Sequence, residues 1–495
     1  MSAMLNFSRK FANSQEGAVL PFFGLIFLVI ILVTGVAVDY SRAQMVQSKL
    51  QYSLDASGLA AAAVKNSRDT NTEVFKFMDA NFPSGYMDAQ YTSASLNGST
   101  YVTSINKPDQ GNGMLELRAA ANVKTLFMHI FGYEEIPVEA YTAIDQSQNK
   151  SELVLVLDIT GSMYGSKIRD LRTAARTLVD SLYKDPSLSQ NQWVGIVPYV
   201  TTVNIGTGRS AWLRNYDLSR YPATYPAGAT KWKGCVEARG QKNEPGNLDL
   251  TDIPPQSGVL NTQFPMFFWE SYDDNKWLLS SGNVNLNENA GYENNSARGP
   301  NVGCGNEVTP LTTDVGMLRT RIGELTPWRR GGTMSSIGMA WGWRMISPRW
   351  KGMWGDPQLP HDADNLIQKT VVVMTDGINA VYTPNASKAF MGSDYTGYGY
   401  IEEENLGAGV NTRVEGVNSV NNKFATICRN MKAQDIRIFA ITFQLGNSAS
   451  ENETRALFRN CATTPDHYFD SPDGNTLRAV FQQIADALAN LRISR

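Results

Sequence analysis

An uncharged apolar stretch near the N-terminus is the feature that most constrains this chain. Residues 21–38, PFFGLIFLVIILVTGVAV, are eighteen positions without a charged side chain. Together with residues 17–20 they are long enough to cross a hydrocarbon layer of about 30 Å as a helix. Pro21 lies near the start, where a proline disturbs a helix least. We therefore predict a membrane-spanning helix that leaves residues 1–16 in the cytoplasm as a short tail and exports the rest.

A cleaved signal peptide is the alternative, because Gly35 and Ala37 are small residues near a possible cleavage point. The apolar stretch is longer than the roughly 7–15-residue core of such peptides. Apolar residues at helical spacing also continue through residues 41–64, with no helix breaker before Gly58. We therefore expect residues 17–65 to form one helix that continues outward from the membrane.

The four cysteines support export. An even number of cysteines outside a reducing compartment indicates two disulfides. Among three possible connectivities we expect sequential pairing, Cys235 with Cys304 and Cys428 with Cys461. Four free thiols in a cytosolic protein are the alternative, which the polar surroundings of Cys235 and Cys304 disfavour. No two cysteines have the short spacing of a zinc site.

Length and charge limit the class of protein. A chain of 495 residues predicts more than one domain, and a formal net charge of −3 lacks the basic field of a nucleic-acid binder. Residues 66–150 are predicted to form a small pilin-like α+β module. Its strand signals are the partly alternating segments 115–132 and 136–145.

The remainder, residues 151–495, alternates short apolar strands with amphipathic helices. The expected strands cover residues 152–157, 193–200, 370–376 and 436–443, and the expected helices cover 167–183, 315–326, 334–346, 417–433 and 477–491. This alternation predicts a doubly wound, mostly parallel α/β sheet with helices on both faces. Two long polar segments without periodicity, 207–310 and 377–412, are predicted to be insertions.

Polar residues stand where the first apolar strand ends. Asp158 directly follows that strand, and the hydroxyls of Thr160 and Ser162 follow at alternate positions. Ligands of open α/β sheets bind at the carboxyl ends of the strands. Alternate residues of an extended loop share one side, so these three side chains can face one point.

Two further oxygens are candidates for the same point. Thr333 in RRGGTMSS directly precedes an expected helix, where it can also act as N-cap, and Gly331 and Gly332 allow a close approach. Asp376 ends the strand TVVVMTD. Two carboxylates and three hydroxyls are hard ligands that suit a magnesium-class ion. Each motif alone is a common turn or cap, whereas their order and context favour a metal site with a position open to a partner's carboxylate.

The motifs DITGS, GGT and VVVMTDG, in this order, resemble the metal-ion-dependent adhesion site of von Willebrand factor type A domains. The resemblance covers about residues 150–491 apart from the insertions. It implies that the metal ligands are Asp158, Thr160, Ser162, Thr333 and Asp376. Thr160 replaces the usual serine and keeps its hydroxyl. The implied ion is Mg²⁺, with Mn²⁺ or Ca²⁺ as alternatives.

The N-terminal segment from residue 15, QEGAVLPFFGLIFLVIILVTGVAVDYSRAQ, looks like the leader of TadE/TadG-like proteins of Flp (tight adherence) pilus assembly. GGTMSSIGMAWGWRMISPRW and the C-terminal NCATTPDHYFDSPDGNTLRAVF look like TadG-type members. The resemblance implies a single-pass protein of the bacterial inner membrane with its large C-terminal part in the periplasm. It would help to assemble or anchor pili by binding an acidic group of another pilus or envelope component.

Two other functions remain open. One is a pilus-tip or surface adhesin that uses the same fold. The other is a metal-dependent hydrolase, because D-x-D-x-T begins aspartate-based phosphatases, but Thr160 stands where the second acid would donate a proton. His129, His361 and His467 lie far apart in the sequence, and no G-x-S-x-G motif is present. We therefore expect no enzymatic activity.

Overall fold

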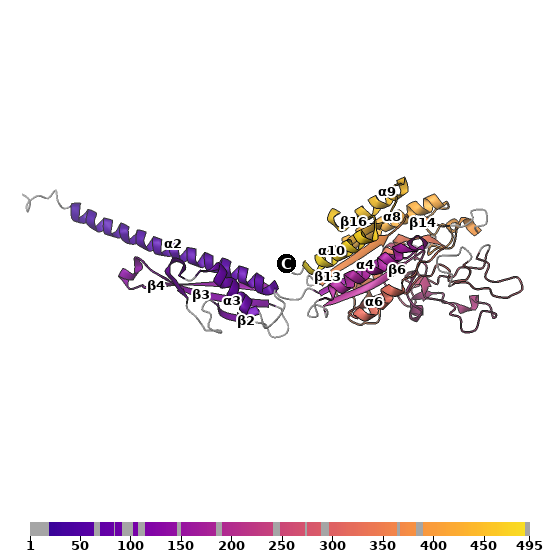
Figure 1. The fold of residues 1–495 in the computed structure, drawn as a ribbon, viewed down its shortest axis with the longest axis horizontal. Helices are drawn as coiled ribbons and strands as arrows, with labels where there is room; N and C mark the ends of the chain where they lie inside the picture. Colours follow the sequence, from indigo (N-terminus) through magenta and orange to yellow (C-terminus); the bar gives the residue numbers. More distant parts are fainter. Residues whose placement is uncertain are drawn as a thin grey trace, which may run out of the picture. The chain divides into compact units, whose positions relative to one another are not determined.

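Figure 1 shows the computed structural model of the chain, which consists of two compact units, Met1–Ser147 and Gln148–Arg495. The structure describes residues 19–63, 70–83, 85–91, 102–106, 114–145, 150–184, 191–240, 248–272, 275–288, 297–363, 367–382 and 390–490. The predicted cytoplasmic tail, residues 1–16, lies outside the described residues.

The first unit is organised by one long helix, α2 (Val19–Ala63), of 45 residues. Its stretch Phe22–Ala60 is, among the described residues, the one helix long and apolar enough to cross a membrane. The N-terminal half exposes its apolar side chains, whereas the C-terminal half buries residues spaced three or four apart. These buried residues are Ala43, Val46, Leu50 and Leu54. The helix therefore changes from an apolar rod into a packed element without a break.

A second helix and a small sheet complete the core of this unit. The helix is α3 (Thr70–Asn81), and the strands are β1 (Ala89–Tyr91), β2 (Val102–Asn106), β3 (Met114–Lys124) and β4 (Glu135–Asp145). β1, β2 and β4 all pair antiparallel with β3. The strand signal predicted over residues 115–132 was too long, because β3 ends at Lys124 and the chain then turns through a short 3₁₀ helix, Met128–Phe131.

The second unit contains a mixed six-stranded sheet in the order β11-β6-β5-β13-β15-β16. Its strands are β5 (Lys150–Asp158), β6 (Gln192–Tyr199), β11 (Thr309–Thr312), β13 (Ile367–Thr375), β15 (Arg437–Phe443) and β16 (Tyr468–Ser471). Neighbouring strands are parallel, except that β11 runs antiparallel to β6. The expected α/β class is confirmed, and the edge strand β11 makes the sheet mixed.

Helices contribute to apolar clusters on the two faces of this sheet. They are α4 (Ser166–Leu182), α6 (Val315–Glu324), α7 (Ser335–Ile346), α8 (Arg413–Lys432), α9 (Ala449–Cys461) and α10 (Gly474–Asn490). Alternate residues of β5 point to opposite faces. Leu155 joins a core with residues of α4, α6 and α10, whereas Val156 joins one with residues of α7, α8 and α9. Burial on both faces explains why β5 is apolar throughout its middle.

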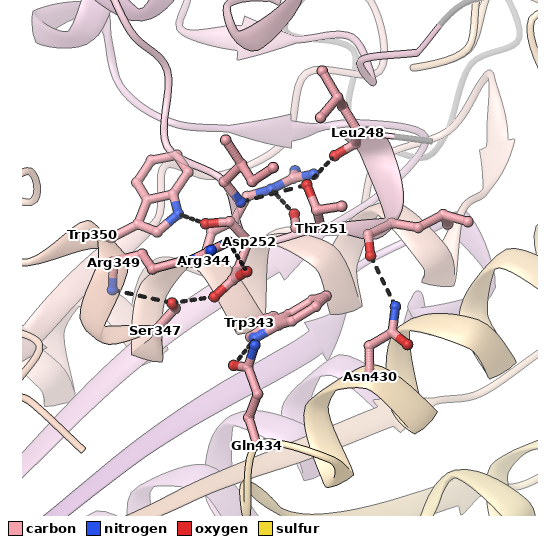
Figure 2. A network of polar contacts seen from close by, with 12 residues as sticks. Leu248, Thr251, Asp252, Trp343, Arg344, Ser347, Arg349, Trp350, Asn430 and Gln434 are labelled. Atoms are coloured by element: carbon pink, nitrogen blue, oxygen red, sulfur yellow. Dashed lines mark hydrogen bonds and ion pairs between the residues drawn. The ribbon is translucent and has the colours of Figure 1, made fainter. Parts of the chain in front are cut away.

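The insertion over residues 207–310 is tied to the end of α7 by buried polar contacts, which Figure 2 shows. The Ser347 hydroxyl donates to Asp252 Oδ2 over 2.5 Å, and the Trp350 indole donates to the Asp252 carbonyl over 2.7 Å. Arg344, which is 2 % exposed, donates to backbone carbonyls of the insertion. The insertion is therefore part of the folded unit despite its lack of periodicity.

Short strands pair within the insertions and near the candidate site. They are β7 (Val203–Asn204), β8 (Leu213–Arg214), β9 (Cys235–Val236), β10 (Phe264–Pro265), β12 (Gly332–Thr333) and β14 (Ala380–Val381). Two disulfides add covalent links, Cys235–Cys304 and Cys428–Cys461. This is the sequential pairing expected from the sequence. The second disulfide joins α8 to α9.

Candidate metal centre

Asp158 stands at the carboxyl end of β5 and is fully buried. Its Oδ1 accepts hydrogen bonds from the Thr160 backbone N–H over 2.9 Å and from the Thr160 hydroxyl over 2.7 Å. Its Oδ2 accepts one from the Thr375 hydroxyl over 2.8 Å. The apolar residues of β5 fix the strand in the core, so the carboxylate is held at the carboxyl end of this central strand.

A row of polar contacts joins Asp158 to Asp376. The Thr160 and Ser162 hydroxyl oxygens are 3.0 Å apart, and Ser162 Oγ donates to Asp376 Oδ1 over 2.6 Å. β5 and β13 are parallel neighbours, so both carboxylates lie at the same edge of the sheet. The structure therefore brings four of the five predicted ligands together, over a sequence separation of more than 200 residues.

Thr333 lies on β12, where it pairs with Ala380 of β14, four residues after Asp376. Among the described contacts, no hydrogen bond joins the Thr333 hydroxyl to the other four predicted ligands. Its expected role as N-cap is wrong, because α7 begins at Ser335 with Met334 as N-cap and no side-chain cap bond. The helix therefore starts one residue later than a Thr333 cap would require.

Two glycines before Thr333 permit the close approach of β12 to its neighbours, as the sequence predicted. Gly332 has φ +102°, and a Cβ there would lie 1.8 Å from the Ala380 carbonyl oxygen. Gly331 has φ +82°, and a Cβ there would lie 2.5 Å from the Thr201 side chain. Both positions thus require glycine for space and for backbone conformation.

Three residues at the site were not identified from the sequence: Lys167, Tyr199 and Thr375. Lys167 Nζ lies 2.7 Å from Asp376 Oδ2. The Tyr199 hydroxyl donates to the Met374 carbonyl over 3.1 Å and lies 3.4 Å from Asp158 Oδ2. The sequence held one indication of the role of Lys167. The positive end of the helix dipole repels a lysine in the first turn, so a lysine there indicates a nearby acid.

Two buried carboxylates lie close together at the carboxyl ends of β5 and β13, and their negative charges repel each other. Burial, and then the negative charge of Asp376, raise the pKa of Asp158 to about 7, against the hydrogen bonds from Thr160 and Thr375. A divalent cation among these oxygens would relieve that repulsion, and mixed carboxylate and hydroxyl donors suit a magnesium-class ion. No group of three or more His, Cys, Asp or Glu suited to a metal occurs in the described part of the chain. A metal site at this position would therefore depend on the hydroxyls as donors.

Solvent reaches the row at one residue. Asp158, Thr160 and Asp376 are buried, whereas Ser162 is exposed. The exposed side chains of Tyr164 and Ile378 are close to it in sequence, each two residues from a predicted ligand. A ligand from outside the chain would therefore approach from the Ser162 side.

Comparison with solved structures finds pilus proteins and a protein from the mussel byssus. The vWF domain of the type V pili tip protein Mfa5 from Porphyromonas gingivalis is 13 % identical, with 70 % of this chain and 97 % of that chain covered and a TM-score of 0.35. The pilus adhesin SpaC from Lactobacillus rhamnosus GG is 12 % identical, with 77 % and 33 % covered and a TM-score of 0.33. This chain thus spans about a third of the length of SpaC.

A third similar structure is proximal thread matrix protein 1 from the mussel byssus, with a zinc-occupied MIDAS motif. It is 12 % identical, with 69 % of this chain and 48 % of that chain covered and a TM-score of 0.30. The search of curated proteins found no match. Residues 17–64 match the family described as putative Flp pilus-assembly TadE/G-like. Residues 17–64 thus form a TadE/G-like segment, which confirms the TadE/G-like leader predicted from the N-terminal sequence.

Proposed function

We propose that this protein is a membrane-anchored, non-enzymatic envelope component of Flp pilus assembly or anchoring. Its second unit would act as a von Willebrand factor A-type domain that binds an acidic group of another pilus component in the presence of a divalent ion. The observation that carries the proposal is the row of contacts from Asp158 through Thr160 and Ser162 to Asp376.

The donor set supports a metal-dependent binding role. Asp158, Thr160, Ser162 and Asp376 would hold the ion, with Thr333 of β12 as the fifth predicted ligand. When bound, a magnesium-class ion would supply a Lewis-acidic position for a carboxylate oxygen. The exposed Ser162, and the exposed apolar side chains of Tyr164 and Ile378, would face the partner.

The surroundings of the three histidines support a non-enzymatic role. His361 Nδ1 lies 2.8 Å from Glu152, near the opposite end of β5 from Asp158. His467 packs on Phe439, and His129 belongs to the first unit. None of them is bonded to the row of oxygens, so a general base of this type is missing from the described contacts there.

The long helix supports the proposed location. The apolar part of α2 would cross the bacterial inner membrane, with residues 1–16 in the cytoplasm and both folded units in the periplasm. Both disulfides would then lie in the periplasm, an oxidising compartment in which disulfides form and persist. The proposal also includes a magnesium-class ion as cofactor and an acidic group of another pilus component as partner.

Binding experiments on the full chain test this function. Asp158→Asn should abolish Mg²⁺ binding, measured by calorimetry. It should also abolish the Mg²⁺-dependent capture of pilus components from solubilised envelopes. Asp466→Asn, at an exposed residue outside the site, is the matched control and should behave as the native chain. Equal capture in chelator, or by the Asp158→Asn protein, would reject the role of the metal.

Cell fractionation separates assembly from adhesion. An assembly or anchoring component should remain with the inner membrane and stay inaccessible to protease added to intact cells. A surface adhesin should be shed or cleaved by that protease.

A further inference from the structure

The connection between β3 and β4 exposes a group of large apolar side chains. Residues 125–133, TLFMHIFGY, contain no acid, lysine or arginine, and charged residues resume on both sides at Lys124 and Glu134. Ile130 is 67 % exposed and Phe131 is 51 % exposed. Loops that face water are usually polar, so this composition indicates an apolar environment outside the protein.

This loop is fixed against α2 by two contacts within the first unit. The Asp39 carboxylate accepts hydrogen bonds from the backbone N–H groups of Leu126, Phe127 and Met128, each over 2.8 Å. Gly35 lies against Phe127 so closely that a Cβ on Gly35 would be 2.7 Å from the Phe127 side chain. The height of the loop, meaning its position along the axis of α2, is therefore fixed beside Gly35 and Asp39.

That height coincides with the end of the uncharged stretch. Asp39 is the first charged residue after residues 21–38, and Gly35 lies about 4.5 Å before Val38 at 1.5 Å per residue. The helix and the loop also share an apolar pocket of about 360 Å³. Its lining residues are Leu32, Val33, Val36, Met128, Phe131 and Tyr133. The exposed loop residues therefore continue the apolar surface of the helix at the level of its last two uncharged turns.

We propose that residues 125–133 form a second membrane contact, which inserts into the leaflet next to the folded units. Phe131 and Tyr133 would lie at the boundary between acyl chains and headgroups, where aromatic side chains are favoured. The loop would bury apolar surface in lipid, as an interfacial segment does, while Asp39 satisfies its backbone donors. It would thereby fix the depth and rotation of α2 in the bilayer.

The inference rests on the membrane-spanning role of α2, so its test must report on the helix and the loop separately. The native cysteines are paired in disulfides and the structure has no free thiol in its described residues, so one introduced cysteine is a unique labelling site. Full-length Ile130→Cys and Phe131→Cys proteins would be labelled with an environment-sensitive fluorophore and reconstituted into vesicles with or without brominated acyl chains.

Two further labelled variants serve as controls. Val29→Cys lies in the middle of the uncharged stretch. Tyr141→Cys is exposed on β4 near Gln51, which lies about 20 Å beyond Val38 along the helix. We expect blue-shifted emission and at least about twofold quenching by brominated lipid at Ile130, Phe131 and Val29, and neither effect at Tyr141.

The outcomes separate the two hypotheses. Quenching at Val29 with water-like, unquenched emission at both loop sites would overturn the loop proposal and leave the spanning helix intact. A blue shift at the loop without quenching by lipid would also overturn it, because protein, such as a second copy, would then cover the loop. Absence of quenching at all sites would reject the spanning helix itself.

Discussion

Lys167 Nζ lies 2.7 Å from Asp376 Oδ2 and forms an ion pair inside the candidate metal centre. The Asp376 side chain is fully buried, whereas the Lys167 side chain is 22 % exposed. The ammonium group therefore neutralises a buried carboxylate that a divalent ion would also neutralise. Because both cations use the same carboxylate, the lysine should compete with the metal.

Lys167→Met should therefore raise the affinity for Mg²⁺. Removing the competing charge is expected to strengthen binding by about tenfold, which corresponds to about 1.4 kcal/mol. Calorimetric titration of the full chain measures the change. Lys184→Met, at an exposed lysine just after the same helix, is the control and should leave the affinity unchanged. Unchanged or weaker binding in Lys167→Met would show that the lysine does not compete.

Thr160→Val should weaken Mg²⁺ binding by at least about tenfold. Valine keeps the shape of threonine but removes the hydroxyl that donates to Asp158 Oδ1 and contacts Ser162. Thr160→Ser restores the hydroxyl and should bind nearly as well as the native chain. Thermal unfolding with and without Mg²⁺ measures the effect as the loss of the metal-induced shift in Tm. Equal shifts in the valine and serine variants would exclude this hydroxyl from the donor set.

Gly332→Ala should destabilise the second unit by about 3 kcal/mol, because strain at positive φ adds to a collision with the Ala380 carbonyl. Gly355 has φ +116°, but a Cβ added there would meet no atom within 4 Å, so Gly355→Ala isolates the strain and should cost about 1 kcal/mol. All ten tryptophans lie between residues 193 and 354. Their fluorescence during urea unfolding therefore reports on this unit, and equal losses in both variants would contradict the close contact.

Glu237 should make stability fall as pH rises. Burial is the main cause that raises its pKa to about 7, although the Tyr395 hydroxyl donates to its carboxylate and opposes the shift. The folded state thus holds a proton that the unfolded state releases. The contribution is fully present below about pH 4.5 and is lost as pH rises through about 7, which amounts to about 3 kcal/mol.

Glu237→Gln tests this pH dependence, because the amide stays neutral at all pH values. The difference in unfolding free energy between pH 4.5 and pH 8 should shrink by about 3 kcal/mol relative to the native chain. Glu402→Gln, at an exposed residue, should leave the pH profile unchanged. Parallel profiles for the native chain and Glu237→Gln would assign the pH dependence to other groups.

Strongly apolar elements of the second unit were predictable because burial determines their composition. β5 and β13 are buried through their middles, and the expected strands coincide with them to within a few residues. The edge strand β16 was not predicted, because it is four residues long and pairs with only one neighbour. α9 was also missed, since it buries only Thr454, Phe458 and Cys461 and so has little apolar periodicity.

The candidate site was predictable in part for the same reason. Asp158 and Asp376 follow continuous apolar runs, which place them at one sheet edge without knowledge of the rest of the fold. Lys167 lies in the first turn of α4, where its charge indicates a nearby acid but does not identify Asp376. Tyr199 ends a strand that the sequence does not place next to β5. Contacts of this kind depend on strand order, which local sequence patterns do not specify.

The continuity of α2 has a mechanical consequence. At 1.5 Å per residue its 45 residues span about 68 Å, and they include both the uncharged stretch and the face that packs on β3 and β4. A helix without a break turns as one body, so in the proposed membrane-anchored state the small sheet would follow any tilt of the apolar part of α2. The bilayer would then set the direction in which this sheet faces outward.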